Sequence, residues 1–121
     1  MVEIIAERRK NRRFKLSADL DLTVEFNFPN PHGNNLKLPL TDISASGFSF
    51  AVNDDMQDVE TGMNIVGAVL RFGDCAIHGD LMVMHFTEGT STCGCLFFPA
   101  SDDDLIKMRT LITGIMIGQR S

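Results

Sequence analysis

The stretch Asp19-Leu20-Asp21-Leu22-Thr23-Val24-Glu25-Phe26-Asn27-Phe28 alternates strictly between polar and apolar residues. Leucine, valine or phenylalanine occupies every even position from 20 to 28, and polar residues occupy every odd one. A period of two is that of a β-strand with one face in a core and the other in water. The turn-forming run that starts at Pro29 and ends at Asn35 then stops this strand.

Five more extended segments follow this strand. The alternation resumes at Leu36, Leu38 and Leu40 and again at Phe48, Phe50 and Val52, and three further segments lie near 63–72, 75–86 and 92–98. The residues from Asp42 to Gly47 are predicted to form the tight connection between the second and third strands. Six short strands at this spacing indicate an antiparallel barrel or sandwich rather than βαβ units.

The C-terminal segment changes period and predicts one amphipathic helix over 101–118. Ser101 and Asp104 have the spacing of a capping box with Asp in place of Glu, and three aspartates suit the positive end of the helix dipole. One face carries an apolar stripe that is expected to pack on the barrel: Leu105, Met108, Ile112, Ile115 and Met116. At 121 residues the chain is one domain, divided into a basic arm (1–15), a barrel (16–100) and this helix.

The net charge of −5 conceals a strong asymmetry. Six of the eleven basic residues lie within the eight positions 8–15, whereas the rest of the chain is acidic. Such a body repels long polyanions, so no DNA partner is expected, but a small anion that the arm can cover meets no such repulsion. No apolar run reaches the length of about 18 residues that a membrane span needs, and the N-terminus does not resemble a signal peptide. We therefore expect a cytoplasmic protein without membrane insertion.

Three cysteines, Cys75, Cys93 and Cys95, do not suggest a disulfide framework, because their number is odd and two of them are two residues apart. A metal site would need four ligands at a familiar spacing, which His78 and His85 do not complete. We expect no metal and no cofactor, and we expect these thiols to pack in or beside a strand. The same two histidines are expected to be structural residues of the fifth strand.

A cluster of arginines precedes the first strand, in the segment Glu7-Arg8-Arg9-Lys10-Asn11-Arg12-Arg13-Phe14. It contains two pairs of arginines four residues apart, Arg8 with Arg12 and Arg9 with Arg13. The planar guanidinium group binds a phosphate, or the O6 and N7 edge of guanine, with two hydrogen bonds. Taken alone, the cluster also fits a solvated basic tail.

The connection Thr41-Asp42-Ile43-Ser44-Ala45-Ser46-Gly47 gathers a carboxylate, two hydroxyls and a glycine. An ionised aspartate only accepts hydrogen bonds, so Asp42 suits adjacent donors such as N1–H and N2–H of guanine. Ser44 and Ser46 can donate to phosphate oxygens, and Gly47 permits a close backbone approach or a positive φ. Taken alone, the segment equally fits an ordinary Asx or Ser turn. Together, the two segments favour a nucleotide.

In this order and at this separation, the two segments resemble the paired signature of the PilZ domain family, which binds cyclic di-GMP. That signature is Arg-x-x-x-Arg on an N-terminal arm, followed by Asp or Asn-x-Ser-x-x-Gly on a barrel. Arg9 and Arg13 match the first part, with Phe14 as the hydrophobic residue that follows. Asp42, Ser44 and Gly47 match the second part. The run Gly94-Cys95-Leu96-Phe97 resembles the family's last strand, and the closing helix fits too.

The resemblance implies a six-stranded antiparallel PilZ-type barrel with a flexible arm and a C-terminal helix. It further implies a cyclic di-GMP receptor in which Arg9 and Arg13 bind phosphate and guanine from the arm. Asp42, Ser44 and Gly47 would form the barrel side of the site. Further candidate contacts are Arg8, Arg12, Ser46 and Gly94. Rearrangement of the arm would signal to an unidentified protein effector, in processes that in this family include motility and exopolysaccharide synthesis.

Two other functions stay open at this stage. One is an interaction module of the same fold that does not bind nucleotide. The other is a barrel that binds single-stranded nucleic acid, although such proteins stack bases on aromatic residues and this chain has no Trp and no Tyr. We do not expect an enzyme, because no catalytic triad order, Gly-rich phosphate loop or acid–base pair stands out.

Overall fold

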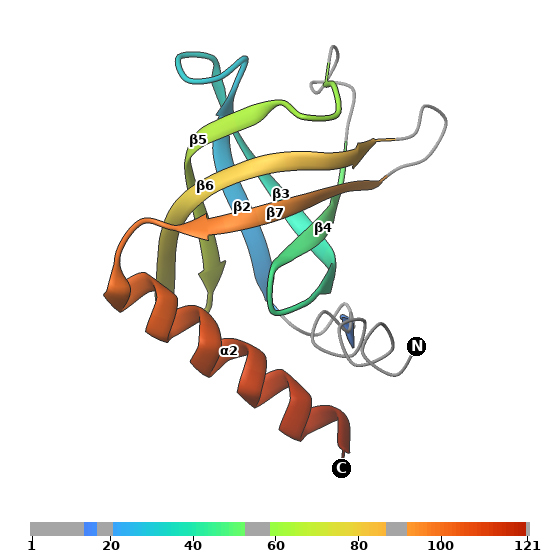
Figure 1. Cartoon of the computed structure of the whole chain (residues 1–121), viewed down its shortest axis with the longest axis vertical. Helices are drawn as coiled ribbons and strands as arrows, with labels where there is room; N and C mark the ends of the chain where they lie inside the picture. Colours follow the sequence, from blue (N-terminus) through green and yellow to red (C-terminus); the bar gives the residue numbers. More distant parts are fainter. Residues whose placement is uncertain (1–13, 17–20, 53–58, 87–91, 121) are drawn as a thin grey trace, which may run out of the picture.

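The strands of this protein close into a barrel, and a helix packs against one end of it (Figure 1). The computed structural model describes residues 14–16, 21–52, 59–86 and 92–120. The strands are β1 (Phe14–Lys15), β2 (Leu22–Phe28), β3 (Asn34–Ile43), β4 (Gly47–Ala51), β5 (Asn64–Phe72), β6 (Cys75–Phe86) and β7 (Thr92–Pro99), and the helix is α2 (Asp102–Arg120).

Six strands form the barrel in the order β3-β2-β5-β6-β7-β4, and β4 returns to pair with β3. All the paired neighbours are antiparallel. This arrangement confirms the six-stranded antiparallel barrel with a C-terminal helix that the sequence predicts. The two-residue β1 is an addition: it pairs with β3 near Ile43, beyond the stretch of β3 that pairs with β2.

The core is filled by the inward-facing side of each strand. In β2 the burial pattern alternates as the sequence does, with the even-numbered residues buried. Phenylalanines from three strands meet at the centre: the ring centroids of Phe26 and Phe50 are 5.7 Å apart, and those of Phe48 and Phe97 are 5.6 Å apart. Such tilted pairs add to the stabilisation that burial of their apolar area provides.

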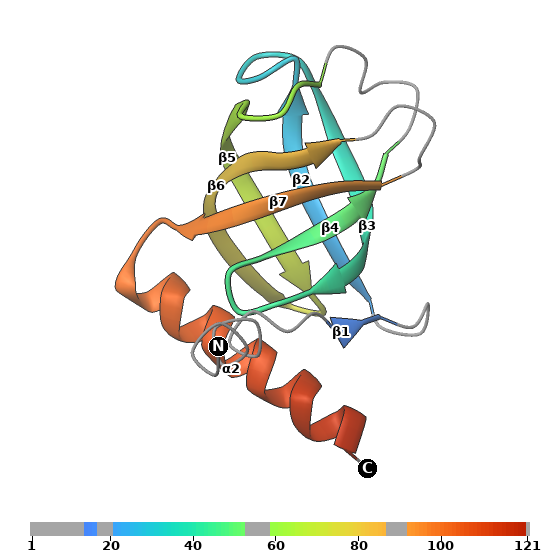
Figure 2. The same ribbon diagram turned by 45° about the vertical axis from the view of Figure 1, so that its right-hand side comes forward.

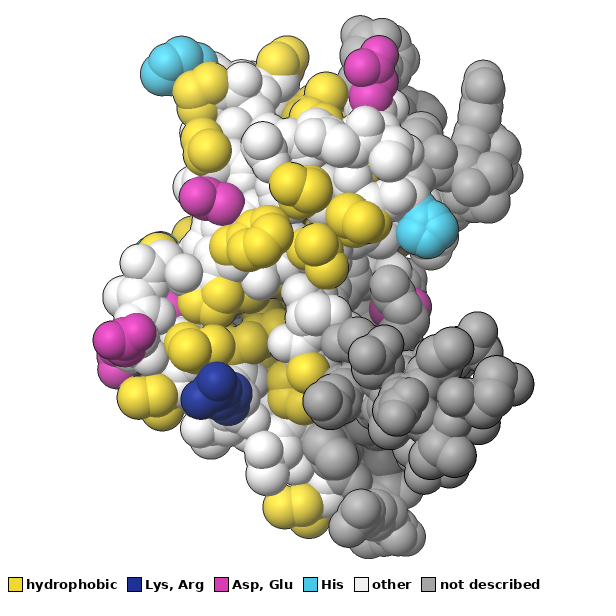
Figure 3. Space-filling model, viewed as in Figure 1, with side chains coloured by type: hydrophobic (Ala, Val, Ile, Leu, Met, Phe, Trp, Pro, Cys, Tyr) yellow, Lys and Arg dark blue, Asp and Glu magenta, His cyan; other side chains and the backbone are white. Residues whose placement is uncertain are grey.

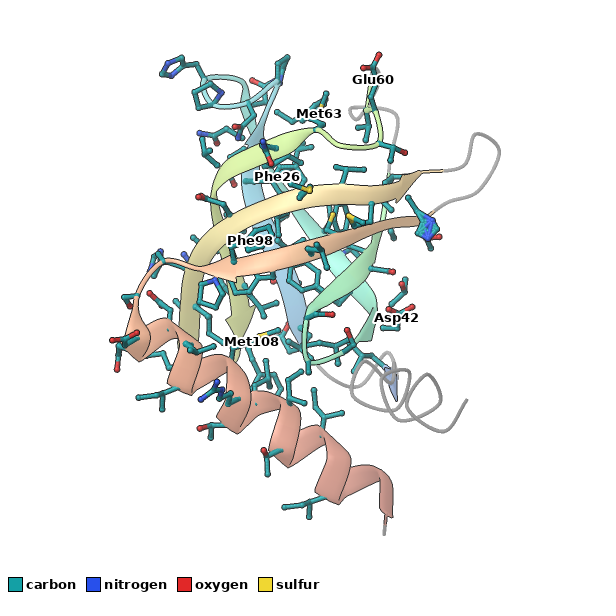
Figure 4. The ribbon with its side chains drawn as sticks, in the orientation of Figure 1. Phe26, Asp42, Glu60, Met63, Phe98 and Met108 are labelled. Carbon is teal, nitrogen blue, oxygen red and sulfur yellow. The ribbon has the colours of Figure 1, made fainter. Side chains whose placement is uncertain are left out.

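Helix α2 packs on β6 and β7, and three of the five residues of the predicted stripe are buried in the core. Met108, Ile112 and Ile115 are buried, whereas Ile106 and Ile117 on other faces of the helix are more than half exposed. Figure 4 shows Met108 on the side of the helix that faces the barrel. The helix begins one residue later and ends two residues later than the predicted 101–118.

The first turn of α2 is capped and joined to the barrel by one carboxylate. The amide of Asp104 donates to Ser101 Oγ (3.1 Å), and the Ser101 hydroxyl donates to Asp104 Oδ2 (2.7 Å). The other oxygen, Oδ1, accepts from the amide of His78 on β6 (2.9 Å). This backbone hydrogen bond, followed by that of Ser101, lowers the pKa of Asp104 from its ordinary value of 3.8.

Substituting Ser101→Ala is expected to destabilise the protein by about 1 kcal/mol, because the helix loses its N-cap and Asp104 loses a donor. The stabilisation from Asp104 is complete above its ordinary pKa of 3.8 and is lost as the pH falls through the lower pKa of the folded state. Urea unfolding of Ser101→Ala and the wild type at pH 7 measures the loss of the cap. Urea unfolding of the wild type at pH values below 4 measures the loss of the stabilisation from Asp104. Equal stability of Ser101→Ala and the wild type at pH 7 would contradict the capping role.

Apolar side chains gather on the face that β6 and β7 present above α2 (Figure 3). Met84 on β6 and Phe98 on β7 are each nearly half exposed. Among the described residues, no helix has both the length and the apolar composition needed to cross a membrane.

Candidate functional site

The segment that carries the Asp-x-Ser-x-x-Gly pattern is more regular than the sequence suggests. Asp42 and Ile43 still belong to β3, and β4 already begins at Gly47, so the connection contains only residues 44–46. The prediction that Asp42 lies in the connection is therefore wrong. The reason is that Asp42 keeps extended pairing with two neighbours: it lies opposite Ser49 of β4 and Lys15 of β1.

Ser44 shapes the short turn between β3 and β4. Its amide donates to the carbonyl of Gly47 (2.8 Å), and its hydroxyl donates to the same carbonyl (3.2 Å). The hydroxyl also lies 3.5 Å from that of Ser46, and Ser44 is only 3% exposed. This is the Ser turn that the sequence left open as an alternative. Ser44 thus fixes the geometry of the turn, and its proton is directed at Gly47 rather than outward.

Gly47 is required by close packing of the two strands and not by a positive φ. It pairs with Leu96 of β7, and a Cβ at this position would collide with the carbonyl oxygen of Cys95 and lie 2.9 Å from Leu96 Cα. Both obstacles are backbone atoms, which cannot turn aside as a side chain can. The Phe97 amide also donates to the Ser46 carbonyl (3.0 Å), so the β4 end of the turn is held against β7.

A row of residues crosses four strands on the outer face of the barrel at this point. Asp42 of β3 pairs with Ser49 of β4, Ser49 with Gly94 of β7, and Gly94 with His85 of β6. Directly paired residues share a face of the sheet. The neighbours of Ser49 and Gly94 along their strands, such as Phe48 and Cys93, point into the core, so this row faces away from the core, although Ser49 is itself only 8% exposed. We call these four residues the outer row.

A register shift lies at each end of the outer row. In β3 the shift falls between Leu40 and Asp42, and in β6 it falls between Val83 and His85. A β-bulge inserts one residue and thereby re-aims the side chains that follow it. At the first bulge, the Thr41 hydroxyl is buried and has no hydrogen-bond partner among the residues that the structure describes. A buried polar atom left in this way is costly to stability, which is a feature of functional sites.

The barrel side of the predicted site is brought together, and the end of the arm lies beside it. Phe14 pairs with Ile43, Lys15 pairs with Asp42, and the Leu16 amide donates to the Thr41 carbonyl (3.1 Å). Figure 2 shows β1 next to the end of β3, and Figure 4 shows Asp42 at that same end. The predicted arm residues Arg8, Arg9, Arg12 and Arg13 lie outside the described residues.

Two members of the outer row, Ser49 and His85, are not among the site residues that the sequence predicts. Ser49 lies between two core phenylalanines, so the alternation alone already placed it on the outer face. His85 was expected to be a structural residue, as was His78, yet both side chains are exposed. His85 is exposed because of the bulge before it. In a regular strand, His85 would point inward as Val83 does, and the bulge reverses that direction.

No group of three or more His, Cys, Asp or Glu side chains that could hold a metal is present in the described parts of the chain. All three cysteines are free; Cys93 and Cys95 are buried in β7, and Cys75 is exposed at the start of β6. The Sγ atoms of the buried pair are 3.9 Å apart. Their mutual hydrogen bond, together with burial, raises the pKa of Cys95, so this thiol is protonated and unreactive at neutral pH.

No family model matches the sequence, and no curated protein matches it. Solved structures do match the fold. The MrkH–c-di-GMP complex from K. pneumonia is 21% identical with a TM-score of 0.73, over 93% of this chain and 54% of that one. The inhibitor of motility MotI/DgrA from Bacillus subtilis is 16% identical with a TM-score of 0.67, over 93% and 51%. This chain therefore spans about half the length of these proteins.

A third structure covers a single domain. The PilZ domain of YcgR from Escherichia coli, solved with c-di-GMP, is 14% identical with a TM-score of 0.72. The similarity extends over 93% of this chain and 95% of that domain, so the two match nearly end to end. Sequence identities this low are evidence of a shared fold alone. The closed barrel, its strand order and its C-terminal helix give this chain the fold of a PilZ domain.

Proposed function

We propose that this chain is a non-catalytic receptor for cyclic di-GMP. The ligand would lie between the arginines of the arm and the outer surface around Asp42. One observation carries the proposal: β1 pairs with β3 at Asp42 and Ile43, so the arm joins the barrel next to the predicted binding segment. Arg13 is joined by a peptide bond to Phe14, which pairs with Ile43, and Arg9 precedes it by four residues.

The residues on the two sides have complementary roles in this proposal. Arg9 and Arg13 supply charge-assisted, bidentate hydrogen bonds to a phosphate or to the O6 and N7 edge of guanine. Asp42, which is partly exposed, accepts from the N1–H and N2–H edge. Arg8 and Arg12 are candidates for further phosphate contacts, as Ser46 is from the barrel side.

We assign a positioning role to two of the motif residues. Ser44 and Gly47 hold the β3–β4 turn in place through the hydrogen bonds and the close packing described above. Their part in the proposed site is to position Asp42 and the backbone around it. A direct contact from Ser44 to phosphate would require its hydroxyl to turn away from the Gly47 carbonyl.

The matching structures support this ligand. MrkH has been solved in complex with c-di-GMP, and so have full YcgR and its PilZ domain. The charge of this chain supports it too: the basic residues are concentrated in the arm, and the body is acidic. A small dianion would contact the arm and only a small part of the barrel, whereas a long polyanion would also extend along the acidic remainder of the body.

In the proposed mechanism, the output is a change in the arm that a partner protein reads. Binding orders arm residues at a backbone entropy cost of about 1–2 kcal/mol each, which the arginine contacts offset in part. We propose no DNA contact by this domain. MrkH is described as a c-di-GMP-dependent transcription regulatory factor, but the matched part covers only 52% of that protein.

Isothermal titration calorimetry with cyclic di-GMP tests the proposal, with cyclic di-AMP as the control ligand. We expect saturable binding of cyclic di-GMP that weakens as salt is raised. Binding of cyclic di-AMP should be at least about tenfold weaker, because adenine lacks the paired donors that Asp42 would accept. Absence of heat from a protein whose circular dichroism shows an intact fold would favour the interaction module instead. Tighter binding of a short single-stranded oligonucleotide would favour the nucleic-acid-binding barrel.

A further inference from the structure

His85 stands at the far end of the outer row from Asp42, on a strand that the sequence signature does not include. Neighbouring strands lie about 4.8 Å apart, so three strand spacings separate the two residues by roughly 14 Å. One ligand lying along the row would therefore contact Asp42 and His85 with different parts of its structure.

The exposure of His85 depends on the bulge in β6. Val83 is fully buried opposite Cys95, and both Met84 and His85 are exposed, although alternate residues of a regular strand point to opposite faces. The bulge therefore turns an imidazole outward that would otherwise enter the core. Bulges are common next to binding sites because they re-aim a side chain in this way.

At the centre of the row, Gly94 lies between the side chains of His85 and Ser49, and both Gly94 and Ser49 are buried. A Cβ added to Gly94 would lie 3.3 Å from His85 Cδ2 and 3.4 Å from Ser49 Oγ. The His85 ring thus reaches over the position where Gly94 has no side chain. Gly94 has no positive φ, and no backbone atom is among the close neighbours of its added Cβ, so neither demand of the fold explains the glycine here.

We infer that His85 is a ligand-binding residue whose exposed ring, packed over Gly94, stacks on a base of the cyclic dinucleotide. This inference rests on the proposed function and extends its site from β3 and β4 to β7 and β6. Imidazole rings stack on unpaired bases, and this contact does not depend on the identity of the base. His85 therefore adds affinity, and Asp42 remains the residue that selects guanine.

Calorimetry on four proteins tests this inference: the wild type, His85→Ala, His85→Phe and His85→Gln. We expect His85→Ala to weaken cyclic di-GMP binding at least about fivefold, His85→Phe to restore most of it and His85→Gln to restore little. His32→Ala, which removes an exposed imidazole from the β2–β3 loop, is the matched control and should bind as the wild type does.

The outcomes show whether a failure concerns only the role of His85 or the proposed function as well. If the wild type binds and His85→Ala binds equally well, the inference is overturned and the proposed receptor function stands. Restoration by His85→Gln but not by His85→Phe overturns stacking in favour of a hydrogen bond. If the wild type does not bind cyclic di-GMP, both proposals are overturned together.

The variant Gly94→Ala is a second, independent test of the inference. The added methyl group would push against the His85 ring and the Ser49 hydroxyl, so we expect weaker binding from a protein that remains folded. In a double-mutant cycle, Gly94→Ala should have a smaller effect in the His85→Ala background than in the wild type. If the effects of the two substitutions on the binding free energy are fully additive, the inference that His85 and Gly94 act at one shared contact is overturned.

Discussion

Arg13→Ala is expected to weaken cyclic di-GMP binding at least about tenfold. A hydrogen bond to a charged group contributes about 1.5–3 kcal/mol, and 1.4 kcal/mol corresponds to a factor of ten in affinity. Arg13→Lys should recover only part of the loss, because lysine keeps the charge but cannot form the bidentate pair. The affinities are measured by calorimetry at one fixed salt concentration, since these contacts are screened by ions.

Two comparisons make this result specific. Arg109 is an exposed arginine on α2, so Arg109→Ala removes the same charge from another surface and should leave the affinity nearly unchanged. Arg12→Ala tests the alternative register of the motif, in which Arg8 and Arg12 form the pair. Wild-type affinity of Arg13→Ala together with a large loss in Arg12→Ala would assign the site to that second pair.

Gly47→Ala is expected to destabilise the fold itself. Its methyl group would collide with the Cys95 carbonyl and approach Leu96 Cα, so β4 and β7 would have to separate at the start of β4. Forcing atoms into a well-packed region costs about 1–3 kcal/mol, and a clash with backbone belongs at the upper end. We expect a loss of at least about 2 kcal/mol and a Tm lower by roughly 8 °C.

Gly114→Ala is the matched control for this substitution. Gly114 lies in α2, and a Cβ there would have no neighbour within 4 Å. Alanine is the better helix former, so this variant should be stabilised by about 0.5–1 kcal/mol. Thermal unfolding of the two variants beside the wild type gives both values. A Gly47→Ala protein as stable as the wild type would show that the strands can move apart at no cost.

The strands and the helix could be predicted from the sequence because their patterns are local. The alternation from Leu22 to Phe28 and the apolar stripe around Met108 each follow from which face is buried. The capping pair Ser101 and Asp104 was also readable from spacing. The contact from Asp104 to β6 was not, because it joins elements that are distant in the sequence.

The parts of the site that were missed depend on pairing between strands. A bulge changes the register by one residue, and nothing in the composition around Thr41 or Met84 marks it. For that reason the sequence predicts a connection at Asp42, where the structure has a strand, and a structural role for His85, whose side chain is exposed. The pairing of β1 with β3 is likewise a tertiary contact, and a strand of two residues is too short to show a pattern that predicts it.

The central claim is that cyclic di-GMP lies on the outer face of the barrel beside the end of the arm. The most direct measurement is a titration of the ¹⁵N-labelled protein with cyclic di-GMP, followed through the backbone amide resonances. We predict that the large shifts cluster at Asp42, Ser49, Gly94 and His85, while Gly73 in the β5–β6 turn stays unchanged. Shifts confined to that turn and to α2, with none around Asp42, would contradict the account.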